Sequence, residues 1–144
     1  MGDIMNKNVL IKVKGIQGSL VEDDAIEMIT TGQYFEKNGK TYIKYEDTAL
    51  DEDVVTSTTI KIDAAQVSVL RFGATNTQLI FEKNQEHFTP YETPFGVFEI
   101  FLRTTDIQFH REIDKVTLNV AYNIEVNHTG AIASNFQVEV TNQM

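Results

Sequence analysis

The stretch VTLNVAYNIEV, residues 116–126, decides the fold, because apolar and polar side chains alternate along it one by one. One face carries the apolar side chains Val116, Leu118, Val120, Tyr122, Ile124 and Val126. The opposite face is polar apart from Ala121. This alternation predicts a β-strand with one side on a core and the other side in water. The segment that follows repeats the pattern through Ile132, Phe136, Val138 and Val140.

The same alternation extends through most of the chain, and it predicts strands at 9–18, 26–37, 41–46, 58–63, 67–73, 78–83 and 95–110. We expect the last of these to bend near 104–106. Asn38 and Gly39 both tolerate the positive φ of a type I′ turn, so they predict a tight hairpin. Further turns are predicted at 73–76, 83–85 and 127–130. A short helix fits only at 24–29, and the Thr-Thr-Gly that follows argues against it.

About nine sequential antiparallel strands joined by short hairpins form a sheet whose two edge strands have unpaired backbone groups. Closure into a barrel pairs these edges and removes them completely. A two-sheet sandwich is the competing architecture. Gly15, Gly32 and Gly96 lie inside predicted strands and permit the sharp bends of a barrel wall. We therefore predict an all-β fold, with residues 1–144 in a single antiparallel barrel of about 8–10 strands. Residues 1–7 are a candidate leader outside the barrel.

Composition excludes several classes of function. The chain has 12 basic and 21 acidic residues and a net charge of −9, which argues against a nucleic-acid partner. It has no cysteine, so a disulfide framework, a thiolate zinc site and a cysteine nucleophile are excluded. No export signal and no run of roughly 20 apolar residues is present, so we expect a cytoplasmic protein that does not span a membrane. A homodimer stays open as an alternative to a monomer.

Several short segments, in order along nearly the whole chain, resemble the YwiB-like family of uncharacterised bacterial proteins. They are Gly32, YIKYE at 42–46, TTIKI at 58–62, LRFG at 70–73, YETPFG at 91–96, VAY at 120–122 and SNF at 134–136. The resemblance implies a calycin-like (lipocalin-like) β-barrel from a mainly Gram-positive group of bacteria. The family is a domain of unknown function, so the resemblance implies no catalytic residue and no cofactor.

Two arginines lie inside otherwise apolar strands and are the main candidates for a binding site. Arg71 shares its face with Val67 and Val69, whereas Arg103 shares its face with Val97, Glu99 and Phe101. Both could lie at a rim, or Glu99 could pair with Arg103. Alternatively, an arginine receives the carboxylate or phosphate of a ligand together with the hydroxyls of Tyr42, Tyr45, Tyr91 or Tyr122.

No motif for catalysis or metal binding is visible. His87, His110 and His128 are far apart, and the acidic runs 22–24 and 46–53 lack the glycine of a calcium loop. Segment 91–96 reads either as a mouth loop or as a rigid turn. A set of aromatic residues could line a cavity or fill a core: Phe72, Phe81, Phe95, Phe98, Phe101, Phe109 and Phe136.

The leading hypothesis is therefore a non-enzymatic barrel that binds a small, largely apolar molecule, either neutral or anionic, in its interior, with no cofactor and no metal. The alternative is a protein-interaction or structural module whose interior is filled by its own side chains. An enzyme ranks third, because no nucleophile–base pair is visible. The state of the barrel interior separates the first two hypotheses. A well-formed apolar pocket of ~300 Å³ or more with an arginine inside would favour ligand binding, whereas side chains packed to the axis would contradict it.

Overall fold

The computed structural model describes residues 7–15, 27–48, 52–74, 76–93 and 95–142. Within these ranges the chain forms ten strands and no helix. The strands are β1 (Lys7–Lys14), β2 (Glu27–Lys37), β3 (Lys40–Asp47), β4 (Thr56–Asp63), β5 (Gln66–Phe72), β6 (Thr77–Glu82), β7 (Glu86–Thr93), β8 (Gly96–Arg111), β9 (Lys115–Val126) and β10 (Ala131–Asn142).

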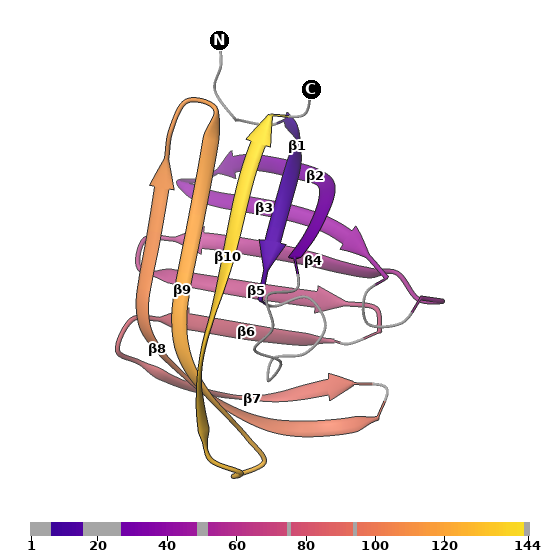
Figure 1. Ribbon diagram of the computed structural model, residues 1–144, viewed down its shortest axis with the longest axis vertical. Coiled ribbons are helices and arrows are strands. Elements are labelled where there is room, and N and C mark those ends of the chain that lie inside the picture. The colour runs from indigo at the N-terminus through magenta and orange to yellow at the C-terminus, as the bar shows by residue number, and fades with distance from the viewer. Residues whose placement is uncertain (1–6, 16–26, 49–51, 75, 94, 143–144) are drawn as a thin grey trace.

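All ten strands belong to one antiparallel sheet in the order β6-β5-β4-β3-β2-β1-β10-β9-β8-β7. Neighbours in the sheet are neighbours in sequence, except that β1 pairs with β10 and joins the two ends of the chain, with Val9 opposite Asn142. The sheet curls into a nearly closed barrel (Figure 1). The prediction of an all-β antiparallel barrel is confirmed, whereas the narrower calycin assignment stays a prediction.

The structure also confirms the predicted hairpin turn at 38–39 and the predicted irregularity near 104–106. Asn38 and Gly39 have φ values of 55° and 78°, as a type I′ hairpin requires. The ladder between β8 and β9 shifts register between Thr104 and Asp106, where the bend was expected. β1 ends at Lys14, earlier than predicted, and residues 16–18, the candidate helix start at 24–26 and residues 1–6 of the leader lie outside the described residues.

Strand β7 was not predicted, because segment 91–96 was read as a loop or a turn. Its C-terminal part, through Thr93, pairs with the start of β8. The inward positions of β7 include His87, Thr89 and Tyr91, whereas Phe88 is 54% exposed. The outward face also carries the exposed Glu86 and Glu92, so apolar and polar side chains are mixed on both faces and the segment carries no clear strand signal.

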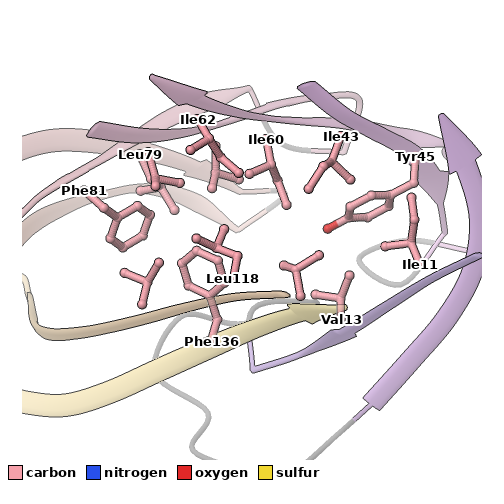
Figure 2. Close-up of a cluster of buried hydrophobic side chains, with 14 of the residues drawn as sticks. Ile11, Val13, Ile43, Tyr45, Ile60, Ile62, Leu79, Phe81, Leu118 and Phe136 are labelled. Atoms are coloured by element: carbon pink, nitrogen blue, oxygen red, sulfur yellow. The ribbon is translucent and has the colours of Figure 1, made fainter. Parts of the chain in front are cut away.

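The middle of the barrel is filled by side chains that reach the axis from opposite walls. The ring of Phe81 on β6 lies 5.1 Å from the rings of both Tyr122 on β9 and Phe136 on β10. Figure 2 shows Phe81 and Phe136 facing each other among aliphatic side chains from both walls. Phe72 and Phe95 are exposed, so the predicted aromatic set does not line one common cavity.

Gly32 on β2 allows close packing between β2 and its neighbours β1 and β3. A Cβ on Gly32 would collide with the backbone oxygen of Lys44 and with the side chain of Ile11. Only glycine lets β2 lie this close to both neighbouring strands, as the glycines inside the predicted strands suggested.

Candidate functional site

A group of polar side chains lies inside the barrel at the end where β3 connects to β4, β5 to β6 and β7 to β8; we call this the loop end. Arg71 on β5 stands opposite Thr58 on β4, which stands opposite Tyr45 on β3. Alternation from the buried Val67 and Val69 turns Arg71 inward, as its position in the sequence suggested. Tyr91 reaches the same region from β7 and Tyr122 from β9.

These side chains form the arginine–tyrosine cluster, defined as Arg71, Tyr45, Tyr91 and Tyr122. The guanidinium of Arg71 donates a hydrogen bond from Nη1 to the Tyr91 hydroxyl at 3.2 Å. Arg71 is only 2% exposed, and the three tyrosines are between 2% and 4% exposed. The alternative that Arg71 is a solvated rim residue is therefore wrong.

Two hydroxyls of the cluster have unused hydrogen-bonding capacity. The Tyr122 hydroxyl is buried and has no hydrogen-bond partner among the described residues. The Tyr45 hydroxyl likewise makes no hydrogen bond of acceptable geometry, although Thr58 and Arg71 lie close to it. A buried polar group left in this state costs about 1–3 kcal/mol, so folding alone does not favour these hydroxyls.

Burial also fixes the protonation state of the tyrosines. It raises the pKa of Tyr122 to about 12, although the positive charge of Arg71 acts in the opposite direction. Burial likewise raises the pKa of Tyr45; Arg71 opposes this effect and the negative charge of Asp47 adds to it. Both hydroxyls therefore keep their protons at neutral pH and are available as donors.

The structure brings together four of the six predicted site residues. Tyr42 lies on the outer face of β3, where its ring stacks on Phe35 with centroids 4.9 Å apart. Arg103 lies exposed on the outer face of β8. Neither belongs to the cluster. Sequence reasoning missed the buried Thr58, although the alternating buried positions of β4 are a signal for its inward direction.

The opposite end of the barrel, where β2 turns into β3 and β8 into β9, is the hairpin end. Here Arg111 on β8 forms an ion pair with Glu36 on β2. The hydroxyl of Tyr34 donates to the same carboxylate at 3.5 Å. The side chains of Arg111 and Glu36 are 47% and 22% exposed, so this pair lies at the solvent-accessible end of the barrel rather than in the core.

Other kinds of site find no support in the part of the chain that the structure describes. No three His, Cys, Asp or Glu side chains gather there as a metal site would require. No helix in those ranges is long and apolar enough to cross a membrane.

Comparison with known proteins agrees with the fold. A family model described as a domain of unknown function, DUF1934, matches residues 11–140. The uncharacterized beta-barrel protein YwiB of Bacillus subtilis is 31% identical over 113 residues, which are 75% of this chain and 78% of that protein. The crystal structure of the ywiB protein from the same organism superposes with a TM-score of 0.80 at 24% identity, over 96% of this chain and 94% of the other. The resemblance seen in the sequence is confirmed.

Proposed function

The chain belongs to the DUF1934 family, and from this premise we propose that it is a non-catalytic binding protein for a small molecule with an apolar body and one carboxylate. The observation that carries the proposal is the arginine–tyrosine cluster. It holds a guanidinium that is 2% exposed beside two buried tyrosine hydroxyls without acceptable hydrogen bonds.

The chemistry of the cluster selects an acceptor-rich ligand. A guanidinium and protonated tyrosine hydroxyls all donate hydrogen bonds, and a carboxylate only accepts them. Asp47 adds negative charge close to Tyr45, which raises the pKa of that tyrosine. A doubly charged phosphate would be repelled more strongly than a carboxylate, so we favour a monoanion.

Packing limits the size of the ligand. The contacts of Phe81 with Tyr122 and Phe136 occupy the axis in the middle of the barrel. The ligand therefore lies at the loop end rather than along the axis. A middle packed to the axis is what the alternative function, a protein-interaction or structural module, requires, and it argues against a ligand on the axis. Binding at the loop end must therefore be measured directly to decide between the two functions.

The test is a titration with octanoate, followed by the intrinsic fluorescence of tyrosine. The chain has no tryptophan and only 5 tyrosines, three of which form the cluster, so the signal reports on the site. We expect saturable binding of one octanoate per chain, at least tenfold weaker in Arg71→Met. The matched control Arg111→Met, at the hairpin end, leaves the affinity unchanged.

Two outcomes would contradict the proposal. The first is that octanoate does not saturate the protein. The second is that Arg71→Met binds as well as the unmodified chain. Native mass spectrometry of the protein from its own host then favours the interaction module if only the bare mass is found.

A further inference from the structure

At the loop end, burial of the inward-facing side chains runs against their polarity. Thr56 and Thr58 on β4 and Arg71 on β5 are between 1% and 2% exposed, although all three are polar. Phe98 on β8 and Val126 on β9 are apolar, yet they are only partly buried. Polar side chains are usually the ones that reach water. Here the polar side chains are covered, and the apolar ones keep part of their surface in solvent.

These partly exposed apolar side chains lie on neighbouring strands and face the interior. Phe98 shares its face of β8 with the buried Ile100, and Val126 on β9 stands opposite Ile100. Ile132 on β10 stands opposite the buried Ile124 on β9 and is still 43% exposed. The three strands follow one another in the sheet (Figure 1). We call Phe98, Val126 and Ile132 the apolar strip.

The apolar strip adjoins the arginine–tyrosine cluster. The Tyr91 hydroxyl accepts the hydrogen bond of Arg71, and Tyr91 stands directly opposite Phe98. Side chains that stand opposite each other on antiparallel strands have Cβ atoms about 4.5–5.5 Å apart. A molecule whose carboxylate binds Arg71 can therefore place its next carbon atoms against Tyr91 and Phe98.

The middle of the barrel is closed to the body of such a molecule. The ring of Phe81 meets the rings of Tyr122 and Phe136 there. Tyr122 is itself a member of the cluster, so carbon atoms attached to a bound carboxylate cannot continue past it along the axis. They have to turn toward the loop end, where the apolar strip lies.

We propose that the ligand binds with its carboxylate inside the arginine–tyrosine cluster and its apolar body on the apolar strip, so that the far end of the body reaches solvent. The inference rests on the proposed function and adds the orientation of the ligand to it. It also widens the class of ligand in one direction, because a far end that lies in water can carry a polar or charged group.

Octanedioate tests this orientation in the unmodified chain. It differs from octanoate by a second carboxylate in place of the terminal methyl group. An isolated charge is costly only where it is removed from water, so we expect octanedioate to bind within about tenfold of octanoate. Titrations followed by tyrosine fluorescence measure both affinities.

The two proposals fail in different ways in this experiment. Saturable binding of octanoate with a larger loss for octanedioate would mean that the far end is buried, which overturns the orientation and leaves the proposed function intact. Absence of octanoate binding would overturn both.

A pair of matched variants tests the contact with the apolar strip. Phe98 and Phe109 lie on the same strand, and both are partly buried, but Phe109 lies at the hairpin end. We expect Phe98→Ala to weaken the binding of octanoate at least fivefold, because apolar contact area with the ligand is lost. Phe109→Ala should leave the affinity unchanged. Equal affinities in the two variants would overturn the role of the strip, and the octanedioate titration decides the orientation even if a variant does not fold.

Discussion

The two ends of the barrel differ in how far an arginine side chain is exposed and in which groups surround it. At the hairpin end Arg111 is 47% exposed and is neutralised by Glu36, which also accepts from Tyr34. At the loop end Arg71 is 2% exposed, and tyrosine hydroxyls beside it lack acceptable hydrogen bonds. The hairpin end is closed with an arginine that stays partly in water beside a carboxylate. The fold therefore does not require a buried arginine and buried tyrosine hydroxyls at the loop end. Polar groups kept at a cost in stability are typical of functional sites.

The largest effect is expected from removing the two arginines in turn. Arg71→Ala removes a buried charge, leaves the Tyr91 hydroxyl without its donor and opens a cavity, so we expect the free energy of unfolding to fall by about 3 kcal/mol. Arg111→Ala at the exposed pair should lower it by less than about 1 kcal/mol. Urea denaturation of both variants measures the difference. Equal losses would mean that the two ends do not differ.

An alkaline titration sharpens the comparison. Tyr122 has a pKa of about 12 in the fold, and an unfolded tyrosine has a pKa of about 10. The unfolded chain therefore releases its proton first, so the contribution of Tyr122 is complete below pH 10 and is lost as the pH rises toward 12. We expect a loss of about 2–3 kcal/mol over this range.

Denaturation midpoints at several alkaline pH values measure this loss. Tyr122→Phe is the matched variant and should flatten the dependence. A pH profile that is the same in both proteins would show that Tyr122 titrates as it does in water.

The smallest effect is expected from removing single tyrosine hydroxyls. The change in the free energy of unfolding should have opposite signs at the two ends of the barrel. Tyr122→Phe removes a hydroxyl without a partner, and we expect it to stabilise the fold by about 1–2 kcal/mol. Tyr34→Phe removes a donor to Glu36 and should destabilise it by up to about 1 kcal/mol. Thermal denaturation at neutral pH shows both signs. Destabilisation by Tyr122→Phe would reveal a hydrogen bond of this hydroxyl in solution.

Much of this arrangement follows from the sequence. Arg71 shares its face with Val67 and Val69, and Tyr45 shares its face with Ile43. The inward direction of both could therefore be read from the pattern, although the sequence alone left Arg71 open between the rim and the interior. The pattern also separates Tyr42 from Tyr45, because neighbours at odd spacing face opposite sides of a strand. Strict use of this rule would have removed Tyr42 from the candidate site.

Arg103 could not be placed in the same way. In β8 the face of Arg103 carries Val97 and Phe101, and the opposite face carries Ile100 and Leu102, so both faces are apolar. Alternation then gives no direction, and only pairing with β9 shows which face meets the core. The contact between Tyr91 and Arg71 could not be predicted either, because the mixed apolar and polar pattern of β7 gives no clear strand signal around Tyr91.

The ladder between β1 and β10 has a consequence for how the chain reaches this structure. It pairs Val9 with Asn142, whereas every other ladder joins strands that follow one another in sequence. Closing a loop costs more entropy as the loop lengthens, so this ladder carries the largest closure entropy in the sheet. It also raises the contact order, a quantity that correlates with slow folding among small proteins. The two meanders β1–β6 and β7–β10 each need only local contacts, and the β1–β10 ladder is the backbone step that joins them into one wall.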